Sequence, residues 1–377
     1  MHKDLNSEQL QYKVFDWLRF PLIVGVVFIH CFGKPFDFSA IDFGNLSGED
    51  YYNLFRVSIS HVLTHVCVPT FYFISGYLFF KGLETWDWTK YVSKLKRRVK
   101  TLLVPFLIWN TIAIVLKMLV EYKNGGVDGI SNFIAENNYW HMYWDCKEWN
   151  VDRTNWIGWG SPASSPYLVP LWFLRDLMIV VLCSPIIHVF FRHLKIVGVI
   201  ILVCCYVTGV FIKIPGFSDM AFLFFGTGAY MKMNSINPTG KWYHYRIPIF
   251  GIAFLLWIVC TIFDGHNTKE GDIIYPFFVI IGFVATLNLA TCIVDKNILR
   301  MPVFLSKASF FIYLSHTILV IKVFNKLSQM IFGNGNPMLM VFSYLLVPVL
   351  TIVFCLSVYY VLNKYIPSLC NVLTGER

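Results

Sequence analysis

The sequence predicts an all-α membrane protein with about ten transmembrane helices and with both termini in the cytoplasm. Of its 377 residues, 56% are hydrophobic and only 14% are charged, whereas a soluble domain has about 25% charged residues. The mean hydropathy is +0.59. Because apolar segments take up nearly the whole length, we expect one polytopic domain over residues 1–377 and no second large soluble domain.

Ten apolar segments are long enough to cross a bilayer, for which a helix needs about 20 residues. Several of them contain proline or glycine, which membrane helices tolerate better than soluble helices. We expect the spans at about 14–33, 57–80, 101–120, 169–191, 195–213, 217–232, 246–263, 273–294, 302–325 and 337–362.

The net charge of +9 would suit a nucleic-acid partner, but the positions of the basic residues exclude one. Lysine and arginine concentrate in the connections that share a side with the two termini, above all in the run from Lys81 to Lys100. Since basic connections stay on the cytoplasmic side, both termini are expected inside. The first residues, MHKDLNSEQLQYK, are polar, and no cleavable signal peptide is expected.

The longest connection, about 121–168, is expected outside. From Tyr139 to Trp159 it contains seven aromatic residues, five of them tryptophan. Two interpretations are open: an aromatic belt at the membrane interface, or a lid or binding loop whose rings stack on a sugar.

The first span carries an ionisable pair, Arg19 and His30, in the run RFPLIVGVVFIH. Eleven residues at 100° each make about three turns, so the two side chains share a helix face and lie roughly 16 Å apart along the axis. Ionisable groups in a spanning helix predict a functional site, and an imidazole can take up and return a proton near neutral pH. Asp16, one turn before Arg19, can pair with it. The alternatives are an anchoring Arg19 and a hydrogen-bonded core His30.

A second signal is the density of basic residues before the third span. Positive-inside topology requires one or two charges, and this segment has more. It predicts a phosphate-bearing ligand or anionic lipid on the cytoplasmic side. The residues are Lys90, Lys94, Lys96, Arg97, Arg98 and Lys100.

Other constellations are weaker. Ser75 and Gly76 interrupt an aromatic helix and favour close approach of a neighbour. His61 and His65 have metal-compatible spacing, but no nearby carboxylate supports a metal, and packing or acceptor contacts are expected instead. Arg175 follows Trp172 and precedes Asp176; it either pairs with that carboxylate or lines the outer half of a cavity. The ten scattered cysteines contain no CxxC motif and predict neither disulfides nor a metal site.

An ordered set of motifs extends over most of the chain. It begins with D-x-x-R-x10-H at Asp16, Arg19 and His30, and continues with VPTFYFISGYL, KRRVKTLLVPFLIW, PLWFLRDLMIVVLCSPII, FLFFGTGAYM and SFFIYLSHTILV. Together these motifs resemble the acyltransferase family 3 integral membrane proteins, in the stand-alone form without an extra soluble hydrolase domain.

The resemblance implies a membrane-bound O-acyltransferase of a bacterial cytoplasmic (inner) membrane. His30 would be the catalytic base, and Arg19 would bind the donor or orient the active site. The family's R-x-x-R is here Arg97 and Lys100, which keeps the charge but not bidentate recognition at the second position. His316 matches the family's YLxH, with a helix-packing hydrogen bond as the alternative.

In the expected reaction, acyl-coenzyme A, with acetyl-coenzyme A favoured, is a co-substrate and no cofactor is permanently bound. Its phosphates would bind near Arg97, Arg98 and Lys100, and its thioester would reach past Arg19. His30 would either deprotonate the acceptor hydroxyl or carry the acyl group. The expected partners are membrane lipids and a sugar, polysaccharide or lipid-linked glycan. The secondary cavity candidates are His316, Ser75, Trp172, Arg175 and His65. The alternative function is a transporter or flippase for a glycan or lipid-linked sugar.

Overall fold

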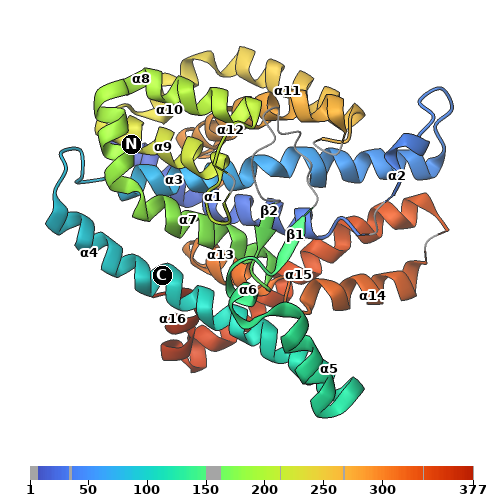
Figure 1. Cartoon of the computed structure of the whole chain (residues 1–377). Coiled ribbons are helices and arrows are strands. Elements are labelled where there is room, and N and C mark those ends of the chain that lie inside the picture. The colour runs from blue at the N-terminus through green and yellow to red at the C-terminus, as the bar shows by residue number, and fades with distance from the viewer. Residues whose placement is uncertain are drawn as a thin grey trace. The chain divides into compact units, whose positions relative to one another are not determined.

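The computed structural model describes residues 7–33, 36–149, 163–212, 214–265, 268–333 and 335–376, and nearly all of its regular structure is helical (Figure 1). Contacts divide the chain into two compact units. The first comprises Met1–Ile74 and Asn234–Val358, and the second comprises Ser75–Met233 and Tyr359–Arg377. Two of the three divisions fall inside α3 (Cys67–Phe79) and α15 (Pro337–Tyr365), and the third directly follows Met233, the last residue of α9 (Asp219–Met233).

The all-α membrane class is confirmed. Among the described residues, six helices are long and apolar enough to cross a membrane, or seven when one bent pair is counted as a span. Several shorter helices, such as α7 (Trp172–Leu182) and α9 (Asp219–Met233), have only 11 and 15 residues and do not reach spanning length alone. The count of about ten and the cytoplasmic termini stay predictions.

In the first unit, α1 (Ser7–His30) packs against α12 and α13, and its residues Val14, Leu18 and Leu22 are buried. α11 and α12 lie side by side in Figure 1. The other helices of this unit are α2 (Gly48–Val57), α10 (Pro238–Lys241), α11 (Arg246–Ile262), α12 (Lys269–Asp295), α13 (Val303–Ser315) and α14 (Val320–Phe332), with short turns at η1 (Phe38–Ala40) and η6 (Tyr243–Tyr245).

Two expected spans of this unit differ from simple helices. The segment expected at 57–80 begins earlier, at Gly48, where Ser47 and Asp50 form a capping box. It then passes through a π turn, η2 (Ser58–Val62), and a 3-10 turn, η3 (Leu63–Val66). The segment expected at 302–325 is broken after Ser315, and α13 and α14 are bent by 82°.

The second unit contains α4 (Trp88–Arg98), which continues through the π turn η4 (Val99–Leu103) into α5 (Val104–Asn137). α8 (Ser184–Thr208) has a backbone break at Lys195, where two adjacent spans were expected to meet. The remaining elements are α6 (Tyr139–Trp144), β1 (Lys147–Trp149), β2 (Ala163–Ser165), η5 (Val169–Leu171), α7, α9 and α16 (Pro367–Thr374), with β1 and β2 antiparallel.

The connection expected as an irregular loop over 121–168 is partly structured. α5 continues to Asn137 with a break at Gly126, and Ile114, Phe133 and Met142 form a small core of their own. The buried Asn110 amide donates to the Met142 carbonyl at 2.9 Å and accepts from the Leu168 N–H at 2.9 Å. Trp156 and Trp159, which contributed to the aromatic pattern, lie outside the described residues.

Arg175 fixes the same segment. Its guanidinium donates to Asp176 at 2.9 Å, to the Trp144 carbonyl at 2.6 Å and to the Ser164 carbonyl at 2.9 Å. Arg175 and Asp176 are both buried. Of the two interpretations of this residue, the pairing with Asp176 is the one that the structure shows.

Removal of the Arg175 guanidinium should destabilise this unit. Arg175→Ala leaves the buried Asp176 carboxylate without its partner, which costs about 3–5 kcal/mol in comparable sites. We expect faster proteolysis of the 121–168 segment in detergent and a lower midpoint of thermal unfolding. Lys117→Ala is the control, because Lys117 forms a partly exposed pair with Glu121 that is worth about 0–1 kcal/mol. Equal proteolysis of the two variants would contradict the tethering role of Arg175.

Gly76 of α3 lies against the backbone of α9. A Cβ atom at Gly76 would lie 2.0 Å from the Phe225 carbonyl oxygen, and a backbone atom cannot rotate away. Gly76→Ala should therefore lower stability by about 1–3 kcal/mol or more through overpacking. Gly251→Ala in α11 is the control, since nothing lies within 4 Å of its added Cβ and alanine favours a helix. Thermal unfolding of the two variants in detergent measures the difference, and equal midpoints would disprove the close contact.

Candidate active site

The first helix places Asp16, Arg19 and His30 on the first unit. The predicted pair is present: Arg19 Nη2 lies 3.1 Å from Asp16 Oδ1. The two side chains are 44% and 63% exposed, so the pair contributes about 0–1 kcal/mol. The Ser306 hydroxyl, which donates to the Asp16 carbonyl at 3.0 Å, ties this end of α1 to α13.

The other end of α1 brings His30 to His316. Their ring centroids are 5.1 Å apart, with an interplanar angle of 54°. His316, the residue after α13, is completely buried, and its Nδ1 lies 2.9 Å from the Ile312 carbonyl oxygen. This hydrogen bond stays within α13 and uses only one ring nitrogen, so it is not the helix-packing bond given as the alternative for His316. Two imidazoles side by side in an apolar unit can perform proton transfer or nucleophilic attack.

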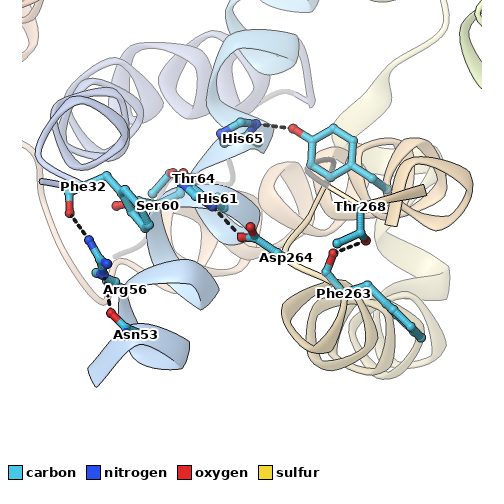
Figure 2. Close-up of polar contacts among 11 residues, drawn as sticks. Phe32, Asn53, Arg56, Ser60, His61, Thr64, His65, Phe263, Asp264 and Thr268 are labelled. Carbon is cyan, nitrogen blue, oxygen red and sulfur yellow. Dashed lines mark hydrogen bonds and ion pairs between the residues drawn. The ribbon is translucent and has the colours of Figure 1, made fainter. Parts of the chain in front are cut away.

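A polar cluster around Phe32, just beyond the end of α1, was not expected (Figure 2). Arg56 is 4% exposed; its Nε donates to Asn53 Oδ1 at 3.0 Å and its Nη1 to the Phe32 carbonyl at 3.0 Å. The guanidinium carbon lies 4.2 Å from the centroid of the Phe32 ring. Asn53 and Arg56 are three residues apart on α2, a helical spacing that sequence reasoning could have used.

His61 joins this cluster through a carboxylate that is distant in sequence. Its Nδ1 lies 2.7 Å from Asp264 Oδ1, and its ring stacks on Phe32 with centroids 3.8 Å apart. The turn after α11 makes the contact: Asp264 and Gly265 have positive φ values of 50° and 60°. A Cβ at Gly265 would lie 2.8 Å from the His61 carbonyl oxygen, so this position needs glycine.

His65 is used in packing between helices. Its Nδ1 is hydrogen bonded to the Tyr275 hydroxyl, and the two rings form an edge contact with centroids 5.6 Å apart. Ser60, on the same irregular stretch, bonds the Tyr344 hydroxyl at 2.7 Å and the Phe28 carbonyl at 2.7 Å. These contacts fix the irregular η2–η3 stretch against α1, α12 and α15.

The second unit contains the other predicted residues. Arg97 and Lys100 are exposed, and the Arg98 guanidinium lies 5.8 Å from the Phe79 centroid. Lys94 is used in a structural contact. Its Nζ donates hydrogen bonds to the Phe79 and Lys81 carbonyls at 2.8 Å each and so caps the end of α3.

Glu84 lies beside these cations. Burial raises its pKa, but the net shift is downward, because backbone N–H groups of Glu84 and Gly82 and the nearby Lys232 and Lys94 stabilise the carboxylate. Lys232 Nζ is 3.8 Å from Glu84 Oε1. The cationic surface around α4 is therefore partly neutralised by its own carboxylate.

Among the secondary candidates of this unit, Ser75 precedes the close helix contact at Gly76, and Trp172 begins α7 with its ring at an edge to Phe173. Arg175 is engaged in the hydrogen bonds described above. The structure thus brings His30 and His316 together, whereas it uses His65 and Arg175 for structural contacts.

Comparisons with known proteins match nearly the whole chain. The family described as "Acyltransferase domain" matches residues 12–360. The succinoglycan biosynthesis protein ExoH of Rhizobium meliloti (strain 1021) is 25% identical over 376 residues, which cover 96% of this chain and 91% of the relative. No solved structure matches. The chain is a multi-pass membrane protein that belongs to the Acyltransferase domain family, and it is an acyltransferase.

Proposed function

We propose that the protein is a membrane-bound O-acyltransferase that moves an acyl group, with acetyl favoured, from cytoplasmic acyl-coenzyme A to a hydroxyl of a surface sugar or polysaccharide. The observation that carries the proposal is the contact of His30 with His316 inside a membrane acyltransferase. The name of the relative, a succinoglycan biosynthesis protein, supports a polysaccharide acceptor. Family membership favours acyl transfer over the transporter or flippase alternative.

In this proposal His30 acts at the reacting carbonyl. As a base, it removes the proton of the acceptor hydroxyl as the oxygen bonds to the acyl carbon, and it returns the proton to the leaving thiolate. As an acyl carrier, it forms a covalent intermediate that the acceptor then attacks. Arg19, paired with Asp16 on the same helix, orients the donor or the active site.

The donor is proposed to bind the second unit through its phosphates. Arg97 and Lys100 are exposed on the last turns before α5, and Arg98 lies between them in sequence. Guanidinium and ammonium groups form charge-assisted hydrogen bonds with phosphate. The localisation proposed is a bacterial cytoplasmic (inner) membrane, with the α4 surface inside.

Loss of the His30 imidazole should abolish acyl transfer. His30→Ala removes both the base and the carrier, and we expect a fall of at least 100-fold in ester formation. The ester content of surface polysaccharide in cells expressing each variant, measured by mass spectrometry, reports the activity. His244→Ala is the control, because His244 is an exposed histidine of the same unit. Wild-type ester content with His30→Ala would refute the assignment of His30.

Loss of the exposed cations should weaken donor binding. For Arg97→Ala combined with Lys100→Ala, the KM for acetyl-coenzyme A should rise about tenfold or more, since a hydrogen bond to a charged group is worth about 1.5–3 kcal/mol. The kcat should change little, because these residues have no proposed part in the chemistry. Lys96→Ala, an exposed lysine on the same helix, is the control. An unchanged KM, together with weaker binding to anionic vesicles, would assign these residues to lipid.

A further inference from the structure

The break between α13 and α14 interrupts a pair of helices that together are long and apolar enough for one membrane span. The two helices are bent by 82°, and Leu319, a non-glycine residue, has a φ of 65°. The Ile321 N–H reaches back to the His316 carbonyl at 3.3 Å. Irregular backbone at membrane depth is tolerated where it is enclosed by protein or lines a polar site, and strained backbone concentrates at functional sites.

Buried polar atoms gather at this break. Among the residues that the structure describes, His316 Nε2 and Thr317 Oγ1 are both buried and have no hydrogen-bond partner. Thr351 Oγ1 on α15 is also buried without a hydrogen-bond partner. It lies one turn before Cys355, whose Sγ is 3.4 Å from the Ser315 hydroxyl of α13. Native proteins rarely leave buried polar atoms unpaired. Three such atoms on neighbouring elements therefore indicate a site for a polar group.

The chemistry of His316 defines that group. The Ile312 carbonyl can only accept a hydrogen bond, so the Nδ1 that contacts it carries the proton. Neutral imidazole then has a lone pair on Nε2, and this nitrogen needs a hydrogen-bond donor. A thioester carbonyl has no hydrogen to donate, whereas a hydroxyl donates one hydrogen and accepts another from Thr317. Of the two substrates of acyl transfer, the acceptor alcohol fits His316.

We propose that His316 is a second catalytic base, whose Nε2 receives the proton of the acceptor hydroxyl, and that the adjacent His30 carries the acyl group. This proposal rests on the proposed function and decides between the two roles of His30. Thr317 acts as a binding residue that donates a hydrogen bond to the acceptor oxygen.

The reaction then has two balanced halves. First, a nitrogen of His30 bonds to the acyl carbon, the C–S bond breaks, and the thiolate takes the proton from the other ring nitrogen of His30. Second, the acceptor oxygen bonds to the acyl carbon, its proton moves to His316 Nε2, and the C–N bond breaks with its electron pair on His30. The proton then passes from His316 to His30, whose ring centroid is 5.1 Å away.

Separate measurement of the two halves tests the proposal. Purified variants receive acetyl-coenzyme A, or succinyl-coenzyme A as a second donor probe, and both thiol release and acyl group on the protein are measured. We expect His316→Ala to release about one thiol per protein and to retain the acyl group, while ester formation on surface polysaccharide in cells falls at least 100-fold. His30→Ala should release no thiol and form no ester.

Two further variants separate chemistry from packing. His316→Gln keeps a hydrogen-bond acceptor but no base, so it should accumulate acylated protein as His316→Ala does. Thr317→Val keeps the shape and should reduce ester formation without loss of thiol release. Full ester formation by either His316→Gln or His316→Ala would overturn the role of His316. Loss of thiol release in His316→Gln, with the thermal stability of the wild type, would overturn it as well. Retained thiol release and ester formation in His30→Ala would overturn the proposed function itself.

Discussion

A polar group inside an apolar protein must be paired, because an unpaired buried donor or acceptor costs about 1–3 kcal/mol and a charge costs more. This constraint organises both units. Asn110 uses its amide to join α5 to the Met142 and Leu168 backbone, and Arg175 spreads its N–H groups over Asp176, Trp144 and Ser164. Asn110 and Arg175 thus determine which segments lie against one another. Apolar contacts alone would not select these neighbours, because apolar side chains pack against one another without directional preference.

The same constraint separates two groups of polar side chains in the first unit. Arg56 and His61 are buried or half-buried at the end of α1, and the structure surrounds them with Asn53, Asp264 and the Phe32 ring. His316 and Thr317 differ, since each retains a buried atom without a partner among the described residues. A fold that satisfies a buried arginine so thoroughly has the means to satisfy a histidine. These unpaired atoms are the ones for which we propose contacts with the acceptor hydroxyl.

Local sequence features predicted the local structure. The helix through His30 and the Asp16–Arg19 pair follow from spacing within a few turns, and both are present. The contact of His30 with His316 could be suspected from the family motifs, but its geometry depends on the packing of α1 against α13. The hydrogen bond between His61 and Asp264 joins residues 203 positions apart, and no local pattern encodes it. The break at Leu319 lacks proline and glycine, so no turn signal marks it.

The segment after α5 has a consequence for any molecule that reaches it. Tyr139 and Trp140 are exposed, the latter by 79%, on a helix that packs on the core of Ile114, Phe133 and Met142. A ligand that binds a disordered loop has a lower affinity, because ordering the loop costs conformational entropy. Here α6 is already held by the hydrogen bond from Asn110 to Met142. The two rings lie at an interplanar angle of 85°, so a flat ligand would stack on one of them and meet the other at its edge. It would do so on a helix whose backbone was already ordered during folding.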